Sequence, residues 1–229
     1  MKIVMIIFLL STPLFGELPL KAKAKVGCLP ALTLIRKLGQ GTFGEASLAK
    51  FSLDDHRSFV YKRFLFHSKV LTEEGLPPNE NEYQILRRLA KYHVRSIPQV
   101  HAVDEFGMIM EYLEGKSLRQ AMDKSLSYKD KVAVVTDVSE GLSDMHRLHI
   151  VHRDLKPENI MMRITGKGVL VDFGLSKDLS KTTEVKKPKH IGSSSYMPPE
   201  YFEHSIITPK YDVYALGAIL FEILYEQKP

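Results

Sequence analysis

Two short segments carry the side chains in this chain that are best suited to chemistry. The first is His152-Arg153-Asp154-Leu155-Lys156-Pro157-Glu158-Asn159, and the second is Val171-Asp172-Phe173-Gly174. Together they supply carboxylates, an ammonium group and an amide oxygen. Divalent cations prefer oxygen ligands, and a carboxylate can align an acceptor hydroxyl. This set of groups is the one that phosphoryl transfer from a metal-bound nucleotide requires.

A glycine-rich turn lies far upstream of these segments. A strand is predicted over 32–38, followed by Gly39-Gln40-Gly41-Thr42-Phe43-Gly44 and a second strand over 45–50. Glycines have no Cβ, so the backbone can approach phosphate groups closely. Because strands flank the turn on both sides, the pattern favours a nucleotide-covering hairpin over a dinucleotide fold, in which a helix would follow. Ala46 is small enough to pack against a flat adenine.

A third strand is predicted over 58–64, and it carries a lysine. Side chains alternate between the two faces of a strand, so Val60 and Lys62 share one face, while Phe59 and Tyr61 point the other way. A lysine on a strand is commonly a solvated edge charge. The helix that comes next in the chain favours a functional interpretation for Lys62.

That helix is predicted over 79–91, after a proline breaker. Its apolar stripe consists of Ile85, Leu86 and Leu89. Glu82 lies on the same face, and Glu80 points away from it. Because a buried carboxylate is costly without a cation, Lys62 is the expected partner of Glu82 and would then be aimed at nucleotide phosphates. The alternative is that Glu82 lies at the rim of a surface helix.

From about Leu32 onward the chain resembles the eukaryotic-type protein kinases. The resemblance implies an α+β, bilobal fold, with a small antiparallel β lobe plus one helix and a mainly helical large lobe. It implies a kinase domain over 31–229, divided into an N-lobe at 31–110 and a C-lobe at 111–229. Residues 1–30 are then a hydrophobic leader and linker. ATP and Mg²⁺ are the implied cofactors.

The resemblance also assigns roles to the two reactive segments. Asp154 would orient the acceptor hydroxyl and take its proton, and Lys156 would contact the γ-phosphate. Asn159 and Asp172 would hold the metal ions. In a kinase of this type, a lysine at position 156 favours serine/threonine over tyrosine acceptors. Ser193 stands where a hydroxyl can bridge Asp154 and Lys156, and the expected partner is a protein substrate.

The adenine site is assigned by the same resemblance. Met110 falls at the gatekeeper position, and the backbone of Glu111 and Leu113 is expected to hydrogen-bond the adenine edge. Met161 is expected on one face of the ring, opposite Ala46 and Val60. A stacked apolar column is implied between the lobes, anchored by Asp212 and made of Leu86, Val103, His152 and Phe173.

Two helices are predicted after the adenine site. Ser117 is the expected N-cap of the first. The second runs over 128–147, and its buried side is predicted to consist of Val132, Val135, Leu142 and Met145.

Arg153 next to Asp154 implies, by the same resemblance, regulation by phosphorylation of the segment after Gly174. The residues close before Gly192 carry no hydroxyl. Two alternatives are therefore open: a switch at Thr182 or Thr183, or no switch.

Composition limits the other classes. The net charge is +5, from 32 Lys and Arg against 27 Asp and Glu, and the basic residues form no aromatic-interleaved stripe, so nucleic-acid binding is not expected. The single Cys28 excludes an internal disulfide and a cysteine-based metal site. No pattern specifies an oligomeric state.

The first 30 residues leave two alternatives. The apolar run at 3–10 is too short to span a bilayer, and it resembles a secretory signal with cleavage after Gly16 or Ala24. It is otherwise a hydrophobic leader or an over-extended gene start. We expect an exported protein in the first case and a cytoplasmic one in the second, with no membrane association beyond the leader.

The last predicted helix, over 215–225, is apolar and lies close to Pro229. Compared with the family, the last helices of the large lobe are absent, so we expect a truncated kinase in which Leu216, Ile219, Leu220, Ile223 and Leu224 are not all covered. Lys62, Asp154 and Asp172 are all present, which favours an active enzyme. The alternatives are a pseudokinase or nucleotide-binding scaffold, and an inactive kinase fragment.

Overall fold

The computed structural model describes residues 32–40, 44–51, 54–64, 78–103, 107–124, 126–180, 194–200 and 207–229. Several predictions fall outside these ranges: the leader at 1–30, the turn residues Gly41, Thr42 and Phe43, the hydroxyls Thr182 and Thr183, and Ser193. By its internal contacts the chain divides into two compact units, Met1–Leu65 with Val100–Tyr112, and Phe66–Gln99 with Leu113–Pro229.

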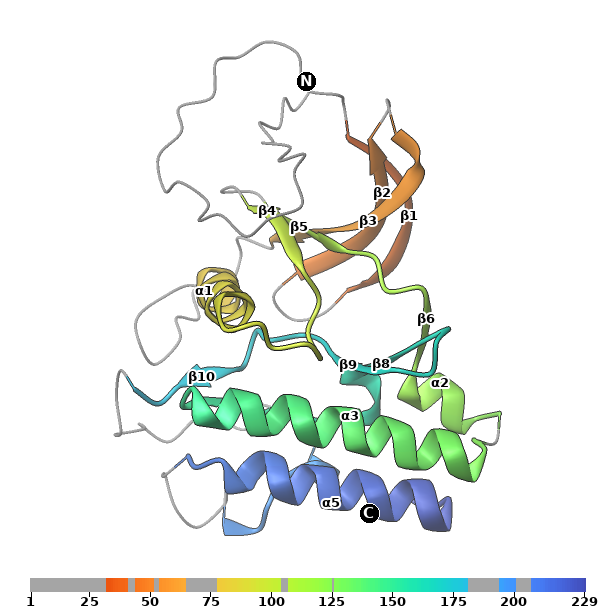
Figure 1. The fold of residues 1–229 in the computed structure, drawn as a ribbon, viewed down its shortest axis with the longest axis vertical. Coiled ribbons are helices and arrows are strands. Elements are labelled where there is room, and N and C mark those ends of the chain that lie inside the picture. Colours follow the sequence, from red (N-terminus) through yellow and green to blue (C-terminus); the bar gives the residue numbers. More distant parts are fainter. Residues whose placement is uncertain are drawn as a thin grey trace. The chain divides into compact units, whose positions relative to one another are not determined.

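The first unit is an antiparallel five-stranded sheet with the strand order β1-β2-β3-β5-β4 (Figure 1). The strands are β1 (Leu32–Gln40), β2 (Gly44–Phe51), β3 (Asp54–Phe64), β4 (Val100–Val103) and β5 (Gly107–Glu111). β3 begins four residues earlier than the predicted 58, because Asp54 pairs with Phe51 at the end of β2. Gly39 and Gly44 lie at the ends of the first two strands, as the hairpin prediction requires.

One face of this sheet is packed with aromatic side chains. Phe59 and Tyr61 are buried with Ala49, Phe51 and Ile109. The rings of Phe51 and Phe59 meet edge to face, with their centroids 5.1 Å apart. Alternation therefore places Val60 and Lys62 on the other face, which confirms the face assignment predicted for the third strand.

The second unit contains the remaining elements. Its helices and turns are α1 (Pro78–Lys91), α2 (Leu118–Met122), α3 (Tyr128–Arg147), η1 (Pro157–Asn159), η2 (Ser194–Tyr196) and α5 (Lys210–Tyr225). Its strands are β6 (Gly115–Ser117), β7 (Ile150–Val151), β8 (Ile160–Arg163), β9 (Gly168–Leu170) and β10 (Lys177–Asp178). They form a three-stranded sheet, β6-β8-β9, and a two-stranded sheet, β10-β7. The long helices α3 and α5 lie side by side (Figure 1).

Helix α1 buries the face that the sequence predicts. Leu86 and Leu89 are fully buried, and Glu82 is only 1% exposed, while Glu80 is exposed. The helix docks on β10 through its polar residues: Asn81 Nδ2 donates to the carbonyl oxygen of Ser176 at 2.8 Å, and Arg88 pairs with Asp178. These contacts explain why α1 groups with the second unit, although the predicted lobe boundary placed it in the first.

The helix starts and faces in the second unit follow from local chemistry. Ser117 accepts a hydrogen bond from the backbone N–H of Gln120, whose side chain bonds back to the Ser117 N–H, so the predicted N-cap is confirmed as a capping box. In α3 the prediction was partly wrong. Leu142 and Met145 are buried as predicted, whereas Val132 is 48% exposed and Val135 is half-buried, because the valines turned inward are Val134 and Val138.

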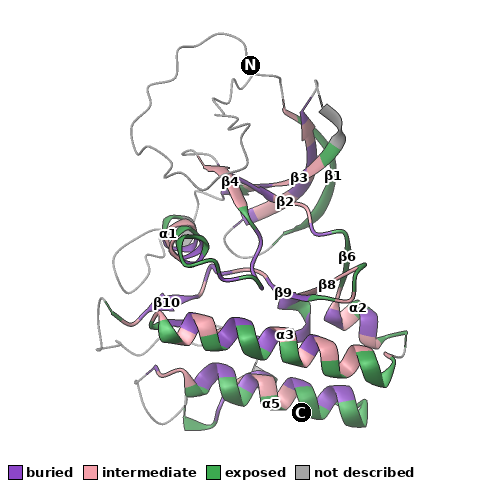
Figure 2. Cartoon of the chain, viewed as in Figure 1, coloured by how far each residue is buried: buried purple, intermediate pink, exposed green. Residues whose placement is uncertain are grey.

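Helix α5 has a buried face and an apolar exposed face. Ile219 and Ile223 are buried, whereas Leu220 and Leu224 are 38% and 50% exposed, which confirms that the apolar residues of this helix are not all covered (Figure 2). Among the described residues, no helix combines the length and the apolar character needed to cross a membrane.

Gly115 at the start of β6 offers a test of the sheet packing. A Cβ at this position would lie 1.9 Å from the carbonyl oxygen of Met162, which is backbone and cannot move aside easily. We expect Gly115→Ala to lower the free energy of unfolding by about 2 to 3 kcal/mol in urea denaturation. The control is Gly217→Ala in α5, where a Cβ would meet no atom within 4 Å and is expected to be neutral or mildly stabilising. Equal effects of the two variants would contradict the packing argument.

Candidate active site

Asp154 is the centre of a three-residue polar cluster. Lys156 Nζ donates to Asp154 Oδ2 at 2.8 Å. Asn159 Nδ2 donates to the same carboxylate oxygen at 2.9 Å and to the Asp154 carbonyl oxygen at 2.8 Å. The structure thus brings together three of the residues to which the sequence analysis assigned catalytic and metal-binding roles. Two donors hold the Asp154 carboxylate in one orientation.

The short turn η1 gives this cluster its geometry. Pro157 occupies the start of the turn, where its missing N–H is not needed, and the Asn159 N–H donates to the carbonyl oxygen of Lys156 at 2.9 Å. The turn carries Asn159 back to the aspartate five residues before it. The Asn159 carbonyl then accepts the N–H of Val171 at 2.9 Å, which ties the cluster to the segment that contains Asp172.

The oxygen atoms of Asn159 and Asp172 are suitable ligands for a magnesium ion. Asn159 uses its Nδ2 for both hydrogen bonds to Asp154, so its amide oxygen is directed elsewhere and can serve as a ligand. Asp172 comes after β9 with φ of 63°, a left-handed conformation that is uncommon for a residue other than glycine. Strain of this kind is concentrated at functional sites. An amide oxygen and a carboxylate are ligands that Mg²⁺ accepts.

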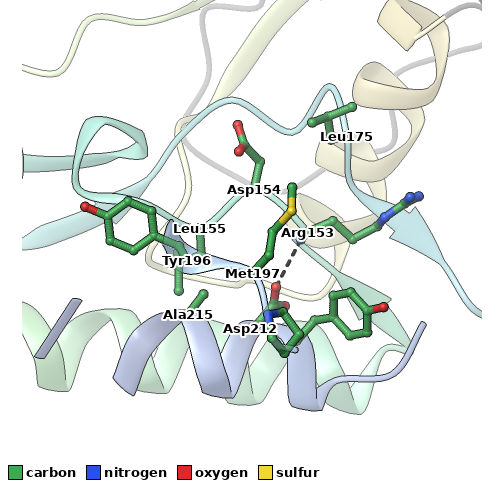
Figure 3. A pocket seen from close by; sticks show the side chains of 10 residues that line it. Arg153, Asp154, Leu155, Leu175, Tyr196, Met197, Asp212 and Ala215 are labelled. Carbon is green, nitrogen blue, oxygen red and sulfur yellow. Dashed lines mark hydrogen bonds between the residues drawn. The ribbon is translucent and has the colours of Figure 1, made fainter. Parts of the chain in front are cut away.

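Asp212, at the start of α5, holds the backbone before the cluster. Its carboxylate is only 1% exposed and accepts three hydrogen bonds: from the His152 N–H at 2.9 Å, from the Arg153 N–H at 3.0 Å and from His146 Nε2 at 2.8 Å. Arg153 has φ of 70° and its N–H bond to Asp212 is drawn in Figure 3. The buried acid fixes a strained backbone beside Asp154, as the predicted anchor role requires.

His152 connects the two reactive segments. Its ring is fully buried, and Nε2 lies 3.2 Å from the carbonyl oxygen of Val171. A carbonyl only accepts, so Nε2 is the donor in this contact. Among the described residues, Nδ1 is the one buried side-chain nitrogen or oxygen with no hydrogen-bond partner. The ring of Phe173 packs at 5.0 Å, which joins two members of the predicted apolar column.

A pocket lies beside this cluster in the second unit (Figure 3). It is lined by Arg153, Asp154, Leu155, Leu175, Tyr196, Met197, Pro198, Tyr211, Asp212 and Ala215. Within 192–200, the sequence predicted a role for Ser193 alone. It did not predict that Tyr196, Met197 and Pro198 would line a pocket together with Asp154.

Four residues of the first unit that were predicted to bind the nucleotide, Gly44, Ala46, Val60 and Lys62, share one face of the sheet. In the strand register Lys62 lies opposite Ala46 and Met108, and Val60 lies opposite Met110. A Cβ at Gly44 would lie 3.1 Å from Lys62 Cε, so the lysine side chain runs closely over this glycine. A small residue, a lysine and a glycine on one face form a surface that fits a flat base and its phosphates.

Other predicted site residues divide between the units. Met110 and Glu111 belong to the first unit, as does Gly39 with its neighbour Gln40. The second unit contains Glu82, Leu113 and Met161. The ion pair between Lys62 and Glu82 therefore stays a prediction, as does the placement of Met161 against the adenine. The burial of Glu82 is the part of that prediction that the structure confirms.

One cluster was missed entirely by the sequence analysis. Arg119 of α2, Tyr196 of η2 and Glu222 of α5 are joined by hydrogen bonds. Glu222 is the single acid in the apolar run 215–225, and it is 3% exposed. An acid inside an apolar helix is the signal that could have indicated this cluster.

Comparison with known proteins places these features in context. Residues 32–229 match the family described as "Protein kinase domain". The chain is 34% identical over 199 residues to serine/threonine-protein kinase PrkC of Bacillus subtilis, covering 86% of this chain and 30% of that protein. It is 34% identical over 124 residues to probable serine/threonine-protein kinase PknB of Lactococcus lactis, covering 53% and 20%. The chain spans less than a third of the length of these two relatives.

Serine/threonine-protein kinase nekl-2 of Caenorhabditis elegans also matches the chain. The identity is 30% over 205 residues, covering 83% of this chain and 56% of that protein.

The anchor role of Asp212 can be tested by Asp212→Asn. The new amide presents a donor where backbone N–H groups already donate, so at least one buried hydrogen bond is lost. We expect the free energy of unfolding to fall by about 3 kcal/mol in urea denaturation. Asp144→Asn is the matched control, because Asp144 is an exposed acid of α3 that pairs with Arg147. A similar small effect of both variants would contradict the anchor role.

Proposed function

Because the chain belongs to the protein kinase family, we propose that it transfers the γ-phosphoryl group of ATP to serine or threonine hydroxyls of protein substrates. The observation that carries this proposal is the cluster in which Lys156 and Asn159 both donate to the Asp154 carboxylate. A carboxylate held in this way is oriented to receive a proton from a bound hydroxyl.

The second unit would perform the transfer with four residues: Asp154, Lys156, Asn159 and Asp172. The acceptor oxygen forms a bond to the γ-phosphorus, the bond to the bridging oxygen of ADP breaks, and the hydroxyl proton passes to Asp154. The ammonium group of Lys156, already beside Asp154, would attract the γ-phosphate to the acceptor. Asn159 and Asp172 would hold Mg²⁺, which when bound neutralises charge on the phosphates.

The first unit would bind the nucleotide on the face that bears Lys62. Ala46 and Val60 would cover the adenine, and Gly44 lets the phosphates approach the backbone and the lysine. The ammonium of Lys62 would contact the phosphates, and Glu82 is its proposed partner. The backbone of Glu111 and Leu113 would bond the adenine edge.

Two observations support a Ser/Thr hydroxyl of a protein as the acceptor. Three relatives that match this chain are named serine/threonine-protein kinases. The pocket lined by Tyr196 and Met197 adjoins Asp154, where the acceptor side chain would enter (Figure 3). The residues next to that side chain would lie against the wall of this pocket.

The proposed reaction is tested by Asp154→Asn. The amide cannot take a proton, so we expect the rate of ³²P transfer from ATP and Mg²⁺ to a generic protein substrate to fall by about 100-fold to 10,000-fold. Binding of ATP should persist in the variant, measured as a rise in melting temperature. Asp144→Asn on the surface of α3 should keep the wild-type rate. If the wild-type protein is stabilised by ATP but transfers no phosphate, it is a nucleotide-binding scaffold and the proposal is wrong.

The variant Lys62→Met tests the proposed contact between Lys62 and the nucleotide phosphates. Since Lys62 acts through its charge on the phosphates, we expect turnover to fall by about 100-fold, with little change in the free energy of unfolding. Arg63→Met is the matched control, because Arg63 is the next residue of β3, lies on the opposite face and forms an exposed ion pair with Glu45. Unchanged turnover in Lys62→Met would remove this lysine from the mechanism.

A further inference from the structure

Arg119 of α2 lies at the centre of a hydrogen-bond network that joins four elements. Its Nη1 donates to Glu222 Oε1 at 2.5 Å, and its Nη2 donates to Glu222 Oε2 at 3.3 Å and to the Tyr196 hydroxyl at 2.7 Å. Its Nε donates to Glu158 Oε1 at 2.8 Å. One guanidinium thus connects α2 with η1, η2 and α5.

The tyrosine completes the network. The Tyr196 hydroxyl donates to Glu222 Oε2 at 2.6 Å and accepts from Arg119. Burial and the hydrogen bond to Glu222 raise the pKa of Tyr196 to about 12, so the hydroxyl keeps its proton at neutral pH. The hydrogen bond to Glu222 also raises the pKa of Arg119, which is therefore always charged. Each polar atom of the Tyr196–Arg119–Glu222 cluster has a partner of the correct type.

The burial of Arg119, Tyr196 and Glu222 restricts how their polar groups can be paired. The Glu222 side chain is only 4% exposed and the Arg119 side chain 22%, so neither charge is well hydrated. A buried carboxylate without its cation would be strongly unfavourable. Tyr196 is 7% exposed and can satisfy its hydroxyl here only by pointing at this pair. The pair therefore selects one orientation of the tyrosine.

The same tyrosine belongs to the wall of the pocket beside Asp154. Tyr196, Met197 and Pro198 are consecutive and all line it (Figure 3). η2 is a single turn of three residues, too short to hold its own position by helical hydrogen bonds. The Tyr196–Pro198 wall must therefore be held by contacts with other elements, and the Tyr196 hydroxyl makes such contacts with Arg119 and Glu222.

We propose that Arg119 is a positioning residue, which with Glu222 holds Tyr196 and thereby fixes the Tyr196–Pro198 wall against which the acceptor segment binds. The inference rests on the proposed function, because it takes the pocket beside Asp154 as the acceptor site. Arg119 would touch neither ATP nor the acceptor. Its effect would be on how well a peptide binds.

The planar fork of the guanidinium is central to this role. Three nitrogens of Arg119 reach three side chains at once, which the single ammonium of a lysine cannot reproduce. Arg119→Lys keeps the charge beside Glu222 but loses the fork. It therefore separates charge compensation from positioning.

The experiment measures steady-state phosphorylation of a serine-containing peptide by wild type, Arg119→Met, Arg119→Lys and Tyr196→Phe. Tyr196→Phe removes only the hydroxyl and leaves the Arg119–Glu222 pair intact, so it covers the case in which Arg119→Met does not fold. We expect the KM for peptide to rise about tenfold in all three variants, with kcat and the KM for ATP within about twofold of wild type. Arg147→Met, which breaks an exposed ion pair on α3, should change neither KM.

A second measurement does not depend on activity. Hydrogen exchange of the peptide 194–200 should accelerate at least about tenfold in Arg119→Met and Tyr196→Phe, while exchange in α3 stays at the wild-type rate. Parallel losses in kcat and both KM values, or uniform acceleration of exchange, would indicate a general structural role and overturn the inference. A wild-type protein without phosphoryl transfer would refute the proposed function, and the exchange rates would still decide the role of Arg119.

Discussion

The rest of the candidate site depends on the hydrogen bonds that the buried carboxylate of Asp212 accepts. A carboxylate removed from water must be compensated by donors, and here the donors are two backbone N–H groups and the ring of His146. Because the N–H groups belong to His152 and Arg153, the compensation fixes the backbone immediately before Asp154. The left-handed conformation of Arg153 is held in this way, and the reactive carboxylate comes directly after it in the chain.

A second acid on the same helix extends this logic. Glu222 lies on the buried face of α5 together with Asp212, and between them the face is apolar, with Ala215 and Ile219. Asp212 holds the backbone next to Asp154, the proposed proton acceptor, and Glu222 and Arg119 bind Tyr196 in the wall of the pocket. One helix therefore supports both sides of the candidate acceptor site through two buried charges rather than through apolar packing alone.

The faces of individual strands and helices could be predicted from the sequence, because they depend on the spacing of residues that are close together in the chain. Period-two alternation placed Val60 and Lys62 on one face, and helical spacing placed Glu82 on the buried side of α1. The prediction failed where tertiary packing chose between adjacent faces of a helix, as for Val132, which is exposed. It could not find the bonds between Arg119 and Glu222, because those residues are distant in the chain and their pairing depends on how α2 meets α5.

The two buried acids of α5 are ten positions apart, and both must face inward. Each residue added to a helix rotates the downstream part of that helix by about 100° and advances it by about 1.5 Å. The number of residues between Asp212 and Glu222 therefore fixes both the distance between the two acids and the angle between their directions around the helix axis. Substitutions in this stretch can be tolerated as long as its inner face stays apolar. An insertion or deletion of one residue there would instead turn one of the two acids out of the interior, so that either the backbone before Asp154 or Tyr196 in the pocket wall would lose its hydrogen bonds to α5.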